Sequence, residues 1–283
     1  MTEPKPFIKW AGGKRQLTSQ LLRYSPINFD DYYEPFLGGG ALFFKLSILG
    51  KIKHAHLNDS IKILIDAYKT VKEKPKDLIE ELKSGKYKNE KDIFYAMRKE
   101  QPLDLVKATA RFIYLNKTAF NGLYRVNSKG EFNVPYGKYK NPKILDEQNI
   151  LAVSKALQKD ELTNVDFEQA VVSAKAGDFV YFDPPYQPLS KTSSFTSYTK
   201  EDFTKKDQER LAKTFTKLHN KGCFVMLSNS HTPLILDLYK DFLPNIQPVL
   251  ATRMINCKAE GRGKIKEVII TNYRCYAPLN VAF

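Results

Sequence analysis

The run Asp183-Pro184-Pro185-Tyr186 holds the residue types of this chain that are best suited to chemistry. It follows the apolar stretch 177–182, which has the pattern of a buried strand. Two prolines cannot continue a strand, because each lacks an amide donor and has a fixed φ. The chain therefore stops at the carboxyl end of a strand, where open α/β sheets bind ligands. A carboxylate and a carbonyl there can accept both hydrogens of a planar amine, and the ring of Tyr186 can stack on its face.

Two segments near the N-terminus have the composition of a ligand-binding edge. Gly38-Gly39-Gly40 lies between a predicted strand at 31–34 and a predicted helix at 41–49, so the backbone can approach a ligand closely. Asp59 follows a second predicted strand, at 52–57, where an acidic residue can bind ribose hydroxyls. Each also has an ordinary interpretation, a tight turn for the glycines and a helix N-cap for Asp59.

Two further segments combine aromatic rings with positive charge. Residues 10–14, Trp-Ala-Gly-Gly-Lys, do not fit the P-loop pattern, but they offer a ring and an ammonium before a helix predicted at 12–24. Residues 120–125 predict a turn that projects Phe120 and Arg125. Arginine reads guanine with two hydrogen bonds, and an aromatic wedge can fill a vacated base position. The alternatives are a surface loop and an ordinary Asn-Gly turn.

The charge of the chain favours an anionic partner. Its 283 residues carry a formal net charge of +14, with a pI of about 9.4, which indicates nucleic acid or an anionic membrane surface. Residues 111–143 hold seven lysines and arginines against Glu131 alone. A second cluster is opposed only by Glu260 and consists of Arg253, Lys258, Arg262, Lys264 and Lys266. Solvated faces are the ordinary explanation, but the glycines, asparagines and aromatics in both clusters favour a nucleic-acid surface.

The remaining composition predicts a soluble cytoplasmic protein. The chain has no apolar run of roughly 18 residues and no signal-peptide core near its N-terminus. Three cysteines, Cys223, Cys257 and Cys275, have no metal-ligand spacing and favour a reducing compartment.

The order of predicted elements indicates an α/β fold, a Rossmann-like doubly wound sheet with an inserted, mostly helical domain. Strands and helices alternate up to about residue 70 and again after 160, with predicted strands at 163–165, 224–227 and 267–273 and a helix from an N-cap at Thr204 to 219. Between them, helices at 75–84, 90–99 and 105–119 follow one another. We therefore expect a first part of a catalytic domain at 1–69, an inserted target-recognition domain at 70–160, and the second part of the catalytic domain at 161–283.

Together these segments match one family. The chain resembles the Dam-type DNA adenine methyltransferases that act on GATC, including enzymes of restriction-modification systems, over nearly its whole length. The resemblance rests on FIKWAGGK (7–14), YEPFLGGGALF (33–43), LND (57–59), FNGLYRVNSKGEFNVPYGKYKNP (120–142), VYFDPPY (180–186), VMLSNS (225–230) and RGKIKEVIITNY (262–273).

The resemblance implies methyl transfer from S-adenosyl-L-methionine to the exocyclic amine of a flipped adenine in double-stranded DNA. It implies that Asp183, Pro184 and Tyr186 are catalytic. The expected cofactor-site residues are Trp10, Lys14, Glu34, Phe36, Gly38, Asp59, Asp166, Phe167 and Asp183. Phe120 replaces a tyrosine familiar at that position and keeps its stacking surface without the hydroxyl. The expected DNA-contacting residues, which include two from the second basic cluster, are Lys9, Phe120, Asn121, Leu123, Arg125, Pro135, Arg253 and Lys264.

The resemblance further implies no metal, no membrane, and a monomer or a weak dimer. Two other functions remain open from the residues. Pro-Pro-Tyr motifs also serve methyltransferases that modify glutamine or RNA bases, because any planar amine needs the same hydrogen bonds. The fold could also belong to a catalytically silent DNA-binding protein, against which the intact Asp183 and the glycine loop argue.

Overall fold

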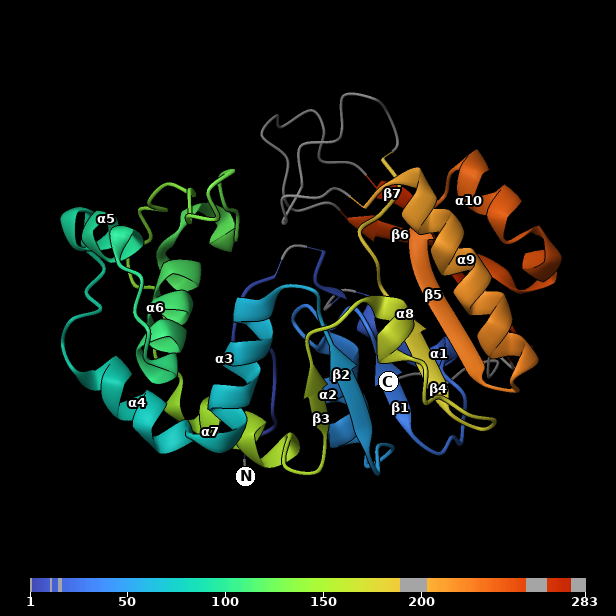
Figure 1. Cartoon of the computed structure of the whole chain (residues 1–283), viewed down its shortest axis with the longest axis horizontal. Coiled ribbons are helices and arrows are strands. Elements are labelled where there is room, and N and C mark those ends of the chain that lie inside the picture. The colour runs from blue at the N-terminus through green and yellow to red at the C-terminus, as the bar shows by residue number, and fades with distance from the viewer. Residues whose placement is uncertain (1, 11, 15–16, 189–202, 253–263, 276–283) are drawn as a thin grey trace.

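The computed structural model describes residues 2–10, 12–14, 17–188, 203–252 and 264–275. Within them, a single seven-stranded sheet crosses the molecule (Figure 1). Its strands are β1 (Tyr32–Glu34), β2 (Ala55–Asn58), β3 (Glu161–Thr163), β4 (Phe179–Phe182), β5 (Phe224–Ser230), β6 (Ile246–Thr252) and β7 (Lys264–Thr271).

The sheet is doubly wound, as predicted. Its strand order is β3-β2-β1-β4-β5-β7-β6, and β7 alone of these strands runs in the opposite direction to the rest. The chain winds outward from β1 in one direction and returns to lie beside β1 with β4, so the sheet has a switch point between these two strands. Glu34 ends β1 and Asp183 directly follows β4, which brings both carboxylates to that point.

Both faces of the sheet are buried. In β4, Phe179 and Tyr181 enter one apolar core while Val180 and Phe182 enter another, because successive strand residues point to opposite faces. Helices α9 (Lys205–Asn220) and α10 (Pro233–Leu238) cover the second face. The helices contributing to the first core are α1 (Thr18–Tyr24), α2 (Ala41–Ile48), α3 (Lys62–Glu73), α4 (Pro75–Lys83), α5 (Lys91–Lys99), α6 (Leu105–Thr118) and α7 (Glu147–Ala156).

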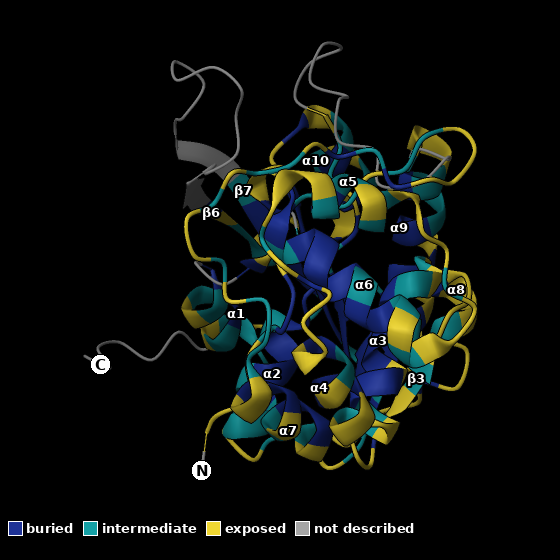
Figure 2. Cartoon of the chain, turned by 90° about the vertical axis from the view of Figure 1, so that its left-hand side faces the viewer, coloured by how far each residue is buried: buried dark blue, intermediate teal, exposed yellow. Residues whose placement is uncertain are grey.

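Helices α4 to α7 follow α3 in the segment between β2 and β3, and they lie to one side of the sheet (Figure 1). Their buried side chains, such as Phe94 and Phe112, belong to the same core as Tyr32 and Tyr181 of the sheet. Figure 2 shows this continuity as buried residues running through α2, α3 and α6. The helical segment therefore shares its core with the catalytic sheet.

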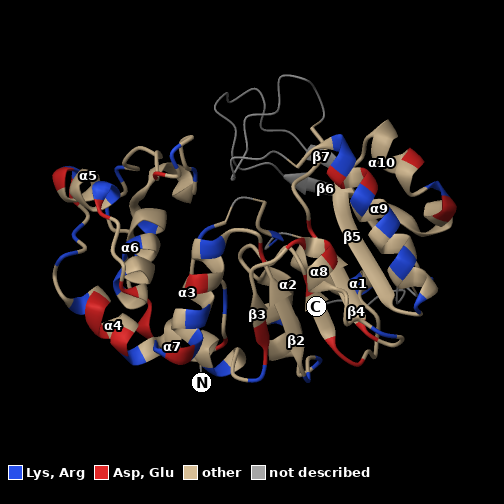
Figure 3. Ribbon diagram, viewed as in Figure 1, with Lys and Arg blue, Asp and Glu red and all other residues tan. Residues whose placement is uncertain are grey.

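Charge is unevenly distributed over this helical segment (Figure 3). Helix α4 carries the acidic residues Asp77, Glu80 and Glu81. The irregular stretch 120–143, which follows α6, carries five lysines and arginines against Glu131. The basic excess predicted for this part of the chain thus sits mainly on its loop.

The local predictions succeeded where a strong local signal existed. Thr204 caps α9 in a capping box, with its backbone N–H donating to Asp207 at 2.9 Å. The helix expected from residue 12 begins only at Thr18, because Gly12 has a φ of 76° and the Gly13 N–H bonds to the Trp10 carbonyl, contacts that a helix starting at residue 12 would not make. The strand expected at 163–165 lies at 161–163 instead.

Other elements were not predicted. Helices α7 and α10 and strand β6 lack a clear periodic pattern. By contrast, a helix was predicted from Phe167, and α8 (Phe167–Ala170) begins there, although it has a single turn. Short 3₁₀ segments at Phe120–Gly122 and Lys240–Asn245 complete the described elements. None of the helices in the described ranges has the length and apolar character needed to span a bilayer. Cys223 and Cys275 are free thiols.

Candidate active site

Asp183 lies where the predicted segments meet. Lys14 Nζ lies 2.9 Å from Asp183 Oδ1, and the same ammonium lies 4.4 Å from the centre of the Tyr186 ring. It also donates to the Gly12 carbonyl at 2.9 Å, which fixes its position. The contact with Asp183 is a close ion pair, and Oδ1 retains a lone pair that can accept a further hydrogen bond. The structure thus brings together three predicted residues from opposite ends of the chain.

Tyr186 is anchored by a residue that the sequence did not indicate. Its hydroxyl donates to Glu267 Oε2 at 3.0 Å, from strand β7. Burial and the nearby Asp183 and Glu267 carboxylates hold the pKa of Tyr186 well above its usual range, so the hydroxyl remains a donor. The ring therefore has a fixed plane beside Asp183, as a stacking platform requires.

The rest of the Asp183-Pro-Pro-Tyr turn is held by β5 and α9. Gln208, fully buried on α9, donates to the Pro185 carbonyl at 3.1 Å and accepts from Asn229 at 3.0 Å. Asn229 Oδ1 accepts the Gln187 amide at 3.2 Å, and Ser230 Oγ donates to the Gln187 carbonyl at 2.7 Å. The segment 225–230, which ends in Ser-Asn-Ser, was among those that carry the resemblance, so part of this network was indicated by the sequence. No such segment includes Gln208.

The glycine loop closes onto Asp59. Asp59 Oδ2 accepts the Gly38 amide at 2.9 Å and Oδ1 accepts the Ile61 amide at 3.0 Å, so the carboxylate ties the loop to the start of α3. Gly38 has a φ of 49°, and a Cβ there would lie 2.8 Å from Trp10 Cδ1. The indole of Trp10 therefore packs directly on the glycine loop. The glycines form more than a tight turn, and Asp59 does more than cap a helix.

Three carboxylates accumulate at this edge. Burial raises the pKa of Asp59 and that of Asp183 to about 6, and it raises the pKa of the fully buried Glu34 well above its usual range. Repulsion among the acids adds to the shift at Glu34, whose Oε2 accepts the Tyr32 hydroxyl at 2.9 Å. A buried carboxyl group resists ionisation, and a cation beside it stabilises its ionised form. Lys14 already places one such cation beside Asp183.

Phe36 and Phe167 also meet, with ring centroids 5.5 Å apart, and Phe203 lies 5.8 Å from Phe36. Asp166, next to Phe167, accepts from Arg210 at 2.8 Å and from the amide of Glu168. The Asp166 carboxylate therefore also caps the N-terminus of α8. The aromatic rings form an apolar wall.

The recognition residues predicted from the loop after α6 are exposed. Phe120 has 47% of its surface exposed to solvent, and Asn121 adopts a left-handed φ of 55°. Arg125 Nε donates to Asn133 Oδ1 at 2.7 Å, which orients the guanidinium. Leu123 packs partly into the core, and the Pro135 carbonyl accepts the Phe120 amide at 2.9 Å. These residues share one ordered loop.

Lys9 joins this loop to the site. The buried amide of Asn116 accepts from Lys9 N and donates to the Lys9 carbonyl, each at 2.7 Å, and it also donates to the Gly122 carbonyl at 3.0 Å. Lys9 Nζ lies over the Tyr139 ring at 4.3 Å. Asn116 carried no signal in the sequence, and Tyr139, although it lies in the quoted segment 120–142, was given no role.

Trp10 adds a ring contact to the same junction. It stacks on Tyr124 with centroids 5.8 Å apart, although the sequence gave Tyr124 no role.

Two of the expected DNA-contacting residues come from the second basic cluster. Arg253 lies outside the described residues, and Lys264 is the first residue of β7, opposite Thr252.

Comparison with known proteins is consistent across the chain. The model of the D12 class N6 adenine-specific DNA methyltransferase family matches residues 10–255. The type II methyltransferase M1.LlaDCHI of Lactococcus lactis subsp. cremoris is 48% identical, with 95% of each chain covered. The type II methyltransferase M.MjaIII of Methanocaldococcus jannaschii is 48% identical over 96% of this chain and 100% of its own. A DNA adenine methylase of Vibrio cholerae is 34% identical over 95% of this chain and 96% of its own.

Proposed function

This chain belongs to the D12 class N6 adenine-specific DNA methyltransferase family, and we propose that its target is the adenine of GATC in double-stranded DNA. The observation that carries the proposal is the meeting of Asp183, Lys14 and Tyr186 beside the buried carboxylates at the sheet's switch point. This arrangement is joined through Lys9 and Asn116 to an exposed loop with Phe120 and Arg125. The type II relatives support a role as the methyltransferase of a restriction-modification system.

The edge fits the cofactor that such enzymes use. S-adenosyl-L-methionine, when bound, supplies a methyl group already activated by a sulfonium charge. The raised pKa values of Asp59 and Asp183 show carboxyl groups that a cation would stabilise in their ionised form. Gly38 leaves the loop without a side chain where Trp10 packs. The residues that would hold the cofactor are Trp10, Lys14, Glu34, Phe36, Gly38, Asp59, Asp166, Phe167 and Asp183.

The target amine would be held by the turn after β4. The Asp183 carboxylate and the Pro184 carbonyl would each accept one amine hydrogen, which leaves the nitrogen lone pair free to point at the methyl donor. Tyr186 would stack on the base. Lys14 now neutralises Asp183 over that ring, so the arriving amine would share or displace its contact. Placement supplies much of the rate, and Asp183 need not be a strong base because the product ammonium is itself acidic.

Target recognition would fall to the loop after α6. An adenine stacked in a duplex cannot reach Asp183, so it must flip out, at a cost of a few kcal/mol. Phe120 would fill the vacated position, and Arg125 would read a guanine, with Lys9, Asn121, Leu123 and Pro135 beside them. We propose the catalytic parts at 1–69 and 161–283 and the recognition insert at 70–160.

One assay tests the target. Purified enzyme is incubated with S-adenosylmethionine carrying a labelled methyl group and, in turn, a GATC duplex, a duplex with the same bases scrambled, an RNA and a protein mixture. We expect label in the GATC duplex alone. Label in RNA or protein would replace the proposed substrate class, and label in both duplexes would remove the GATC assignment.

A second assay tests base flipping. A duplex with the fluorescent base 2-aminopurine at the target adenine should brighten on binding, because an unstacked base is less quenched. The same base placed outside GATC is the control and should change little. An equal response at both positions would contradict flipping of the target.

A further inference from the structure

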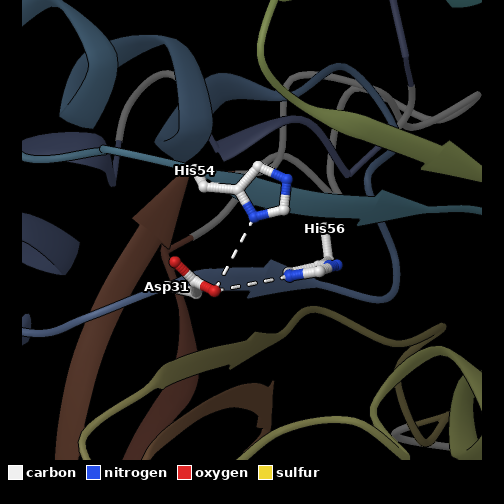
Figure 4. Close-up of side chains that lie close together, drawn as sticks. All are labelled: Asp31, His54 and His56. Carbon is white, nitrogen blue, oxygen red and sulfur yellow. Dashed lines mark ion pairs between the residues drawn. The ribbon is translucent and has the colours of Figure 1, made fainter.

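A cluster of metal-ligand side chains lies at the end of the sheet opposite the active site (Figure 4). Asp31 directly precedes β1, His54 directly precedes β2, and His56 is the second residue of β2. Asp183 follows the far end of a parallel strand, so the cluster plays no part in binding the target base. The chain has only four histidines, and two of them stand here.

The three donor atoms converge. His54 Nδ1 and His56 Nε2 each lie 3.7 Å from Asp31 Oδ2, and all three atoms lie within 4.8 Å of one another. Two ligand atoms of a tetrahedral zinc ion lie about 3.3 Å apart, given bond lengths near 2.0–2.1 Å. The two nitrogen–Oδ2 distances of 3.7 Å exceed this value by only a few tenths of an ångström, whereas the two histidine nitrogens, which lie within 4.8 Å of each other, would have to approach by up to about 1.5 Å.

The surroundings orient the donors. Glu161 Oε2 bonds His56 Nδ1 at 2.9 Å, which turns Nε2 toward Asp31, and Tyr33 stacks on the His56 ring at 4.2 Å. His56 Nε2 is buried and has no hydrogen-bond partner among the described residues. A carboxylate on the far nitrogen of a ligating histidine is the usual support of a metal ligand.

The backbone of Asp31 is also fixed. Its amide donates to the buried Asp178 at 3.1 Å, and its carbonyl accepts the Phe179 amide at 2.9 Å. We propose that His54, His56 and Asp31 bind one divalent transition-metal ion, with zinc as the best match. Two imidazoles and one carboxylate favour zinc, copper or nickel over magnesium or calcium, which prefer oxygen ligands. The ion would link the starts of β1 and β2 and would have a structural role.

The test uses Zn²⁺ itself as the probe. Untagged protein is stripped with a chelator, and Zn²⁺ is titrated in competition with a chromogenic chelator. We expect one equivalent bound and a higher melting temperature with zinc. Asp31→Asn and His54→Gln preserve size and should each weaken binding by more than tenfold, and Glu161→Gln should weaken it by about tenfold through loss of the supporting carboxylate.

The matched control is His231→Gln, which changes an exposed histidine outside the cluster and should bind Zn²⁺ as the wild type does. Melting of each zinc-free variant checks that it folds. Co²⁺ replacing Zn²⁺ should give the intense visible bands of a tetrahedral site in the wild type and lose them in His54→Gln. Wild-type affinity in both Asp31→Asn and His54→Gln, or less than one equivalent in the unmodified protein, would overturn the proposal.

Discussion

The carboxyl edge of the sheet and the loop after α6 are built on opposite principles. At the edge, Glu34 and Asp59 are buried, and burial raises the pKa of each. On the loop, Phe120 and Arg125 face solvent, and backbone bonds such as Asn133 N–H to the Arg125 carbonyl at 3.0 Å hold the chain. Methyl transfer needs charge removed from water, whereas reading a base needs exposed donors on a loop that is already ordered.

The largest effect expected is at the edge. Asp183→Ala removes the acceptor of the amine and should reduce methyl transfer at saturating DNA on the order of 10²–10³-fold or more, as loss of one prepositioned polar group does elsewhere. DNA binding should remain near wild type, because the loop is unchanged. Single-turnover rates and a binding titration measure the two separately, and near-wild-type turnover would remove Asp183 from the reaction.

The matching change on the loop is Arg125→Ala. It should cost roughly 1–3 kcal/mol of binding and relax discrimination at one base pair, while the rate at saturating GATC stays close to normal. Transfer to duplexes substituted at each position of the site provides the measurement. A uniform loss on every sequence would make Arg125 a phosphate contact, and the contrast between the two regions would weaken.

The edge should also respond to pH in a way that the loop does not. The pKa of Asp183 is about 6 in the free protein, and a bound sulfonium would favour the ionised form of this carboxyl group. Below pH 6 Asp183 must lose a proton to bind the cation, so affinity should fall by up to about tenfold per pH unit. S-adenosylhomocysteine, which lacks the sulfonium, is the control, and an equal pH dependence for both ligands would contradict the argument.

The smallest effect tests the connection between the regions. Asn116→Ala loses the bond to Gly122 and should reduce discrimination between GATC and its variants by about 1 kcal/mol, the net value of one hydrogen bond. Asn149 is the matched control. It is equally buried and clasps Lys5 through two bonds of 3.0 Å, but forms no hydrogen bond with the described residues of the loop after α6.

Both asparagine variants should lose thermal stability to a similar degree, because each leaves buried backbone groups unpaired. Only Asn116→Ala should alter discrimination. Equal discrimination in the two variants would mean that the segment at 5–10 supports the fold without linking the loop to the site.

Local signals explain which parts of this structure were predictable from sequence. Thr204 and Asp207 stand three residues apart, so the start of α9 could be predicted directly. The pairing of Lys14 with Asp183 spans most of the chain, and only the resemblance brought both to one site. Gln208 and Asn116 act through contacts between distant segments and lie in ordinary surroundings, so no pattern in the sequence marks them. Glu267 lies within the segment 262–273 that carries the resemblance, but nothing there indicates its contact with Tyr186.

The core that runs without a break from the sheet into α6 affects how this enzyme can change. Phe112 and Tyr32 belong to one packed interior, so the helical segment cannot be exchanged as a cassette without repacking the sheet beneath it. Under the proposed recognition role of the loop after α6, new target sequences would arise more readily through substitutions on that loop, where Phe120 and Arg125 face solvent and the interior is undisturbed. An engineer seeking a new target site should vary that loop and leave the helices that carry it in place.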